Sequence, residues 1–281
     1  MTASYTDVVQ TARDYYNSDD AETVYSTVWG GEDIHIGLYE SDEDTIAEAS
    51  RRTVEQLAQQ LGRLDDSMHV LDMGSGYGGT ARYLAETTGC RVTGLNLSEV
   101  ENQRARQLNE DRGLQERVTI VDGSFEAVDS PGESSDAVCS QDAFLHSGER
   151  LRVVSEAARV LKPGGVFAFT DIMQADDCPD GVLQPILDRI HLSDLGSPAF
   201  YRSAASVQGL EEVAFRDLSP HLSTHYGRVL TETELWEAAL KHRVSSDYLE
   251  RMKKGLSHWV DGGERGYLVW GIFVFRKPSP A

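Results

Sequence analysis

Lysine is scarce in this sequence, and basic residues as a whole are outnumbered by acidic ones. The 281 residues include 46 Asp and Glu against 26 Lys and Arg, which gives a formal net charge of −20. The few lysines are Lys162, Lys241, Lys253, Lys254 and Lys277. Nucleic-acid binding is therefore not expected, because a surface of this charge repels a phosphate backbone. An acidic, lysine-poor surface stays hydrated in concentrated salt, which favours a salt-adapted host.

Long apolar runs and paired cysteines are also missing. No run of about twenty apolar residues occurs, so no membrane span is expected. Residues 1–17 lack the apolar stretch behind a basic start that marks a secretion signal. The cysteines Cys90, Cys139 and Cys178 are odd in number and widely spaced, which fits neither a disulfide framework nor a zinc site. We therefore expect a cytoplasmic protein with reduced thiols and no bound metal.

The middle of the chain alternates apolar runs with amphipathic stretches. The apolar runs predict strands at 69–76, 91–98, 117–124, 135–143 and 166–173. The stretches between them predict helices that end at Gly89, at Gly113 or at a Pro-Gly-Gly sequence. Short, glycine-marked connections between alternating strands and helices predict an α/β fold with a doubly wound, mostly parallel sheet.

The sequence LDMGSGYGG (71–79) is the central motif. Gly74 and Gly76 permit a tight turn after the first core strand and allow a ligand to approach the backbone. Together with Gly79 they also satisfy a dinucleotide fingerprint, which by itself is a weak signal. Asp72 lies two residues before Gly74, where its carboxylate can meet the ammonium group of S-adenosylmethionine (SAM) through water or backbone.

The next strand ends carry polar residues that suit an adenosine ligand. Asn96 stands where an acidic residue usually pairs with an NAD ribose, and its amide can still bind ribose hydroxyls. Asp122 or its neighbours can accept from the adenine amino group, and Phe125 can lie against the ring. These residues could instead serve only as strand-end caps and turns without a ligand. Their chemistry and their order along the chain favour a SAM site over an NAD site. The predicted cofactor site consists of Asp72, Gly74, Ser75, Gly76, Asn96, Leu97, Asp122, Gly123, Ser124, Phe125 and Gln141.

Over about residues 65–175 the chain resembles the class I SAM-dependent methyltransferases. The resemblance is carried by VLDMGSGYGG, GLNLS, VDGSF and LKPGG. It implies a seven-stranded sheet with an antiparallel last strand, with S-adenosylhomocysteine as the product of the cofactor. The segment SQDAFLHS (140–147) replaces the Asn/Asp-Pro-Pro-Tyr motif common in enzymes that methylate DNA adenine or a glutamine amide, which argues against those substrates.

A closer resemblance, over most of the chain, is to the sarcosine/dimethylglycine N-methyltransferases. It is carried by SQDAFLHS, by VYSTVWGGEDIHIGLY (24–39) and by THYGRVL (224–230). The resemblance implies methylation of sarcosine to dimethylglycine and of dimethylglycine to glycine betaine, an osmoprotectant. Phosphoethanolamine N-methyltransferases have a related strand-four segment, with Asp and His at the spacing of Asp142 and His146.

We interpret the flanking segments as additions to this core. The stretch 174–209 breaks the strand–helix alternation, and two late apolar runs enclose a helical stretch at about 231–258. The expected units are an N-terminal helical lid (1–60), a SAM-binding core (61–173), a cap with a late core strand (174–230), and a C-terminal helical stretch with the final antiparallel strand (231–281).

Methylation of an amine requires a free lone pair, so an ammonium substrate must lose its proton. His146 can accept that proton directly or through water, and it lies one helical turn after Asp142. The resemblance to phosphoethanolamine enzymes implies a Tyr–His pair over the amine, which here would be Tyr25 and His146. Whether His146 removes the proton or only holds the substrate in line stays open.

The cation that forms on nitrogen favours aromatic faces, and a substrate carboxylate favours an arginine. Each aromatic residue or arginine in question can instead serve packing or a surface ion pair. The predicted substrate-binding residues are Trp29, Asp142, Arg189, His191, Tyr201, Tyr226 and Arg228, with Arg202 and Trp259 as further candidates.

Three alternatives remain at this point. The acceptor could be phosphoethanolamine, another small amine or a carbon atom, although a phosphate calls for a denser basic pocket than this lysine-poor cap offers. The chain could be a SAM-binding module without catalysis, or an NAD-dependent oxidoreductase. We expect a small amine as the partner, and a monomer or homodimer.

Overall fold

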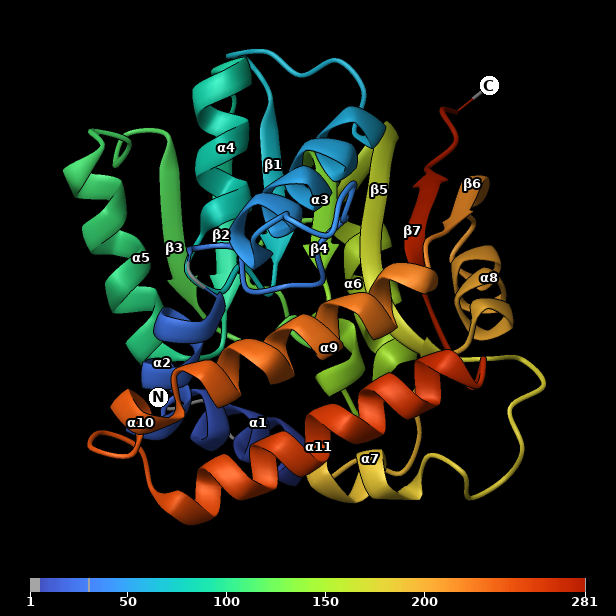
Figure 1. Ribbon diagram of the computed structural model, residues 1–281. Coiled ribbons are helices and arrows are strands. Elements are labelled where there is room, and N and C mark those ends of the chain that lie inside the picture. The colour runs from blue at the N-terminus through green and yellow to red at the C-terminus, as the bar shows by residue number, and fades with distance from the viewer. Residues whose placement is uncertain (1–5, 30, 281) are drawn as a thin grey trace.

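The computed structural model of the chain describes residues 6–29 and 31–280 (Figure 1). Gly30, which belongs to the expected lid sequence WGGEDIHIG, lies outside the described residues.

A single sheet of seven strands forms the centre of the molecule, in the order β3-β2-β1-β4-β5-β7-β6. The strands are β1 (His69–Met73), β2 (Arg91–Asn96), β3 (Val118–Asp122), β4 (Ser135–Gln141), β5 (Leu161–Gln174), β6 (Glu211–Asp217) and β7 (Leu268–Arg276). Strands β1 to β5 pair in parallel, and β7 is antiparallel to both of its neighbours. The predicted fold, a mostly parallel seven-stranded sheet with an antiparallel final strand, is confirmed.

Helices cover both faces of the sheet, which explains the unbroken apolar sequences of the central strands. One face is covered by α3 (Ile46–Gln60), α4 (Gly79–Thr88) and α5 (Glu99–Asp111). The other is covered by α6 (Arg150–Val160) and α8 (Pro198–Val207). The segment predicted as a cap thus contains a helix, α8, that packs on the sheet between α6 and β6.

A second group of helices lies over the end of the sheet toward which β1 to β5 run (Figure 1). They are α1 (Asp7–Tyr16), α2 (Asp19–Val24), α7 (Gln184–Ile190), α9 (Pro220–Leu235), α10 (Glu237–Leu240) and α11 (Ser246–Glu264). Helices α9 and α11 run side by side across this end, and α7 packs against α11. The carboxyl edge of a parallel sheet is where α/β folds bind their ligands, so these helices enclose the expected site.

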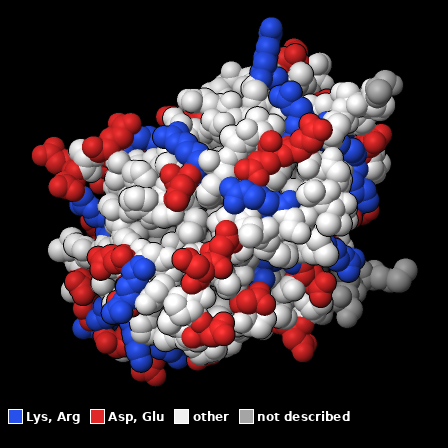
Figure 2. All heavy atoms as spheres, turned by 90° about the vertical axis from the view of Figure 1, so that its right-hand side faces the viewer, with Lys and Arg blue, Asp and Glu red and all other residues white. Residues whose placement is uncertain are grey.

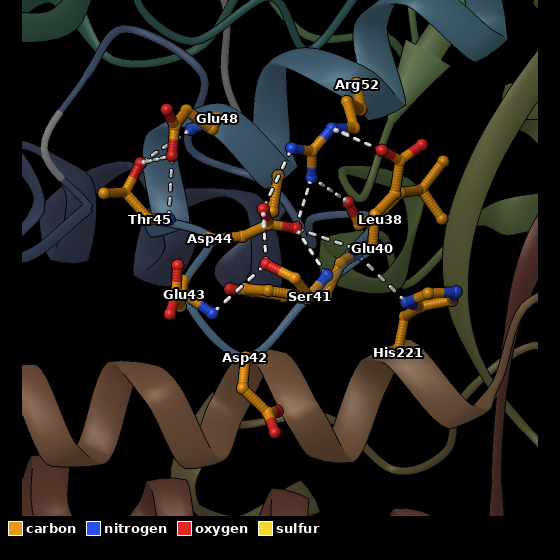
Figure 3. A network of polar contacts seen from close by, with 12 residues as sticks. Leu38, Glu40, Ser41, Asp42, Glu43, Asp44, Thr45, Glu48, Arg52 and His221 are labelled. Atoms are coloured by element: carbon orange, nitrogen blue, oxygen red, sulfur yellow. Dashed lines mark hydrogen bonds and ion pairs between the residues drawn. The ribbon is translucent and has the colours of Figure 1, made fainter.

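Residues 38–45 form a loop that is clamped between α3 and α9 (Figure 3). Asp44 accepts hydrogen bonds from two backbone N–H groups of the loop and pairs with Arg52 of α3 at 2.6 Å. At its other side the loop reaches α9, where the Tyr39 N–H donates to His221 at 3.2 Å. These contacts fix the position of the segment before α3 relative to α3 and α9.

The surface is mixed in charge. Figure 2 shows acidic and basic side chains interspersed over one face, without a continuous basic patch. Within residues 6–29 and 31–280, no helix is both long and apolar enough to cross a membrane.

Candidate active site

A pocket with about 900 Å³ of empty space, including its open mouth, lies at the carboxyl edge of β1, β2 and β4. Small-molecule sites have volumes in this range. Of the eleven residues predicted for the cofactor, the nine that line it are Asp72, Gly74, Ser75, Gly76, Asn96, Leu97, Ser124, Phe125 and Gln141. The structure therefore brings together residues from four strand ends at one site.

The turn after β1 depends on Gly74, which has a φ of +83°. A Cβ at this position would overlap the side chain of Ala143, which follows β4. The Gly74 N–H also donates to the Leu95 carbonyl of β2 at 2.7 Å. The ends of β1, β2 and β4 can meet here because residue 74 has no side chain.

Five buried polar atoms of residues that line the pocket have no hydrogen-bond partner within the described part of the chain, and three of these atoms belong to predicted cofactor residues. These three are Asp72 Oδ2, Ser75 Oγ and Gln141 Nε2. An unsatisfied buried polar group costs about 1–3 kcal/mol, so these atoms call for a ligand with complementary groups. Burial raises the pKa of Asp72 to about 7, and an ammonium group beside it would favour the ionised carboxylate. A carboxylate, a hydroxyl and an amide suit the amino-acid tail of SAM.

Asn96 shares its end of the pocket with Glu101, which the sequence analysis missed. Glu101 lies in the first turn of α5, is buried, lines the pocket and accepts from Asn96 Nδ2 at 2.9 Å. Burial raises its pKa to about 7. Glu101 lies three residues after Ser98, which matches a helix-capping pattern. Because capping alone accounts for a glutamate at this position, the sequence did not indicate that Glu101 lines a pocket.

Asp122 and Gly123 do not line the pocket, contrary to the prediction. The Asp122 carboxylate accepts from Asn102 Nδ2 at 2.7 Å and pairs with Arg106 at 2.7 Å. These partners lie on α5, because the last residue of β3 directs its side chain to that face of the sheet. At this strand end, Ser124 and Phe125 line the pocket instead.

His146 ends a 3-10 turn (Phe144–His146) that follows β4, and it lines the pocket. Its Nε2 lies 2.8 Å from the hydroxyl of Tyr16, the last residue of α1. Burial and the charge of Arg150 lower the pKa of His146 to about 4, so the imidazole is neutral near pH 7. Burial raises the pKa of Tyr16 well above its ordinary value, so the phenol keeps its proton and can donate a hydrogen bond to Nε2 when that nitrogen carries no proton.

The hydrogen-bond partner of His146 is therefore Tyr16, whereas the sequence analysis predicted Tyr25. The Tyr25 ring stacks behind Tyr16 at 6.0 Å between centroids, and its hydroxyl is 3.4 Å from that of Tyr15. Helix α1 passes over the 3-10 turn and presents Tyr16 to it. Tyr15 and Tyr16 are adjacent, and the sequence alone does not indicate which of the two faces the pocket.

Tyr25 belongs to a continuous row of rings that extends from α1 to α11, which we call the aromatic band. Its members are Tyr16, Tyr25, Trp29, His225, Tyr226 and Trp259. Consecutive centroids lie 4.8 to 6.0 Å apart. Three of the predicted substrate or catalytic aromatics and the further candidate Trp259 thus lie in one row, with Tyr16 at its pocket end.

Asp142 follows β4 with a left-handed backbone, at a φ of +50°. Its carboxylate accepts from the Ile36 N–H at 2.8 Å, the Thr170 hydroxyl at 2.7 Å and the Trp270 indole N–H at 2.7 Å. It lines the pocket beside His35, whose Nε2 has no partner among the residues described. Asp142 therefore joins the segment before α3 to the sheet, in addition to facing the pocket.

Three residues predicted to bind substrate lie elsewhere. Tyr201 of α8 is fully buried in the core beneath that helix and donates to Asp171 at 2.5 Å. His191 is exposed and ends α7 with a φ of +56°. Arg228 donates to the backbone carbonyl of Asp42 and lies 3.6 Å from its carboxylate. These residues serve the core, a helix end and the clamped loop, because α8 covers the sheet and α9 contacts residues 38–45.

Of the arginines considered, Arg189 of α7 faces the interior of the helical group. Its side chain lies against Gly255 of α11. Its charge lowers the pKa of Tyr226 and of Tyr248, although burial raises both more strongly. Arg202 instead pairs with a surface glutamate at 2.9 Å. The structure describes no group of three or more His, Cys, Asp or Glu side chains that could hold a metal ion.

Comparison with known proteins gives a consistent result. Residues 71–169 match the family model of the methyltransferase domain. The chain is 55% identical, over 99% of its length, to the whole sarcosine/dimethylglycine N-methyltransferase of Halorhodospira halochloris. It is 48% identical, over 96% of its length, to 98% of the enzyme of the same name from Aphanothece halophytica. A solved structure from Galdieria sulphuraria, provisionally named a sarcosine dimethylglycine methyltransferase, has a TM-score of 0.90 at 43% identity and covers 95% of this chain and 100% of that chain.

The position of Tyr201 predicts an effect on stability and not on ligand binding. Tyr201→Phe removes a buried hydrogen bond to Asp171 and should lower the free energy of unfolding by about 1–3 kcal/mol. Urea denaturation measures this change, and calorimetry measures binding at the pocket. Tyr83→Phe is the control, because the Tyr83 hydroxyl has no hydrogen bond within the described chain. Weakened binding at unchanged stability would contradict the core role of Tyr201.

The burial of His146 predicts acid sensitivity of a defined sign. The folded pKa of about 4 lies below the ordinary 6.5, so between these values the unfolded chain binds a proton that the folded chain does not. The stability that the neutral His146 contributes to the folded state is fully present above about pH 6.5 and is lost as the pH falls toward 4. From about pH 7.5 to pH 5, the wild type should lose about 2 kcal/mol more stability than His146→Gln. Urea denaturation at both pH values tests this, and equal losses would show that His146 titrates normally.

Proposed function

This chain belongs to the family of sarcosine/dimethylglycine N-methyltransferases, and we propose that it methylates the nitrogen of sarcosine and then that of dimethylglycine, with SAM as the methyl donor. The products are dimethylglycine and glycine betaine. One observation carries the proposal: the identity of 55% spans the whole chain and so includes the helices over the pocket, beyond the matched domain at 71–169. Those helices are the part of the molecule that can distinguish one acceptor from another.

The cofactor SAM supplies a methyl group on a sulfonium centre when it is bound. The strand ends that line the pocket are neighbours in the sheet. An extended nucleoside ligand can therefore bind across them one after another. The residues that we assign to SAM are Asp72, Ser75 and Gln141 for the amino-acid tail, Asn96 and Glu101 for the ribose, and Ser124 and Phe125 for the adenine. The unpartnered polar atoms of the first three support this assignment.

The aromatic band suits the charge that develops on the acceptor. A quaternary ammonium forms in the second methylation, and aromatic faces attract such a cation electrostatically. Tyr16 brings the band to the pocket, and Tyr25 and Trp29 continue it. Because the rings are mostly buried, water competes weakly for the cation, which strengthens the attraction.

The Tyr16–His146 pair offers a path for the amine proton. When the neutral imidazole carries its proton on Nδ1, the Tyr16 hydroxyl donates to His146 Nε2, so its oxygen can accept from the ammonium of the acceptor while its own proton moves to the imidazole. Burial disfavours the imidazolium that results, but the same burial disfavours the ammonium. The amine therefore loses its proton where its lone pair is needed, and the pair also orients it.

We further propose that the enzyme acts in the cytoplasm, as a monomer or homodimer, on a small amine. The unpaired thiols of Cys90, Cys139 and Cys178 support a reducing compartment. The acidic, lysine-poor composition supports a role in osmoprotection at high salt.

A panel of acceptors tests the proposed reaction. The purified protein is incubated with SAM and, separately, with glycine, sarcosine, dimethylglycine and phosphoethanolamine, and S-adenosylhomocysteine is measured. Sarcosine and dimethylglycine should be turned over. Turnover of phosphoethanolamine without dimethylglycine would contradict the proposal, and SAM binding without any turnover would indicate a binding module.

Substitutions separate the proton path from cofactor binding. His146→Ala and Tyr16→Phe should each lower kcat by about 10²- to 10⁴-fold with little change in SAM affinity, because both interrupt the path. Tyr25→Phe keeps the ring and should lower kcat less than Tyr16→Phe, since the hydroxyl that it removes lies next to those of Tyr15 and Tyr16 and not next to His146 Nε2. Asp72→Asn should instead weaken SAM binding. A full rate for His146→Ala at every pH would exclude His146 from the proton path.

A further inference from the structure

Gly255 lies in the middle of α11, at a position where alanine would favour the helix more. A methyl group built on Gly255 would overlap the guanidinium of Arg189, and its three nearest neighbours are all atoms of that side chain. The other two glycines near the end of α11 differ. A methyl group on Gly262 or Gly263 meets residues of β7 and α9 first, so those positions serve the packing of the helix. Gly255 makes room for one arginine.

Arg189 has no anionic partner among the residues that the structure describes. Arg189 is partly buried, yet it makes no hydrogen bond or ion pair with any residue the structure describes. The more deeply buried arginines do: Arg82 pairs with Glu32, and Arg150 pairs with Asp194. None of the acidic side chains that the structure describes forms an ion pair with Arg189, although the chain has 46 acidic residues. A partly buried guanidinium without an anion loses part of its hydration without compensation, so this position suits an anion that arrives with a ligand.

The surroundings of Arg189 connect it to the acceptor side of the site. Its charge acts on Tyr226, which belongs to the aromatic band, and on Tyr248. The Tyr248 hydroxyl is 3.2 Å from that of Tyr15, the neighbour of Tyr16. Arg189 therefore lies near Tyr226 and Tyr248, next to α11, and the Tyr16–His146 pair lies at the pocket end of the band.

We propose that Arg189 binds the carboxylate of the acceptor and that Gly255 keeps its guanidinium within reach, so that the two residues select amino acids over simple amines. The inference rests on the proposed function, because it assigns the one group that sarcosine and dimethylglycine share besides the amine. A guanidinium matches a carboxylate with two parallel hydrogen bonds. Tyr226 and Tyr248 keep their protons and can donate to the same anion.

This subsite orients the acceptor. Nitrogen and carboxylate are joined by one methylene group, so an anchored carboxylate leaves the nitrogen little freedom except to turn toward the Tyr16–His146 pair. Such restriction of a short substrate is a large source of rate, since it removes unproductive orientations before the methyl transfer.

Two variants test the subsite in different ways. Arg189→Gln removes the charge, and Gly255→Ala keeps it but displaces the guanidinium. Each should raise the KM for dimethylglycine by about 10- to 100-fold, as expected for loss of a charged hydrogen bond, and leave the calorimetric Kd of SAM unchanged. Gly255→Ala should unfold at the same temperature as the wild type or higher, because alanine favours the helix. Gly227→Ala in α9 is the matched control, because a methyl group there meets no atom within 4 Å, and it should leave the KM unchanged.

The acceptor 2-dimethylaminoethanol, which has an uncharged CH2OH group in place of the carboxylate, completes the test. The wild type should prefer dimethylglycine in kcat/KM, and both variants should lose this preference. An unchanged KM for dimethylglycine in both variants, or no preference in the wild type, would overturn the subsite while the methylation of dimethylglycine itself stands. A wild type that methylates neither sarcosine nor dimethylglycine would instead refute the proposed function.

Discussion

The carboxylate of Asp142 accepts hydrogen bonds from three distant parts of the chain, and the geometry of the site depends on this junction. The Ile36 N–H comes from the segment before α3, the Thr170 hydroxyl from β5 and the Trp270 indole from β7. Burial raises the pKa of Asp142, and the nearby His35 and the three hydrogen-bond donors oppose that shift by favouring the ionised carboxylate. Because the left-handed turn at Asp142 leads directly into the Phe144–His146 turn, the junction also sets where His146 lies.

Burial has opposite effects on the groups around this junction, and together they suit an amine. It lowers the pKa of His146 and raises that of Tyr16, so both are neutral, and it raises the pKa of Asp72 at the cofactor end. A chamber that disfavours charge also disfavours an ammonium relative to the free amine. The cation produced by methylation then has aromatic faces instead of water. The site thus combines low polarity for deprotonation with rings for the charged product.

Much of the fold and of the cofactor site could be predicted from local sequence. Strand–helix alternation and glycine-marked turns are short-range properties, and strand ends of a parallel sheet necessarily meet at one edge. The failures share a cause. Asp122 was misplaced because its side chain turns toward α5, Tyr201 because α8 covers the sheet, and Arg228 because α9 contacts the clamped loop. Each depends on how separate elements pack, which neither periodicity nor a motif records.

The sequence by itself determined the class of fold and the edge at which the cofactor is expected, and it predicted His146 as the candidate proton acceptor. Tertiary structure decided the partner of that histidine. Tyr16 and Tyr25 carry the same chemistry, but α1 passes over the turn that ends in His146, so Tyr16 reaches it and Tyr25 stacks behind. Tertiary structure also decided among the arginines, since ion pairs neutralise Arg202 and Arg228, whereas Gly255 leaves space for Arg189. The physical reason is that the availability of a charge depends on its neighbours in space, and these come from helices far apart in the chain.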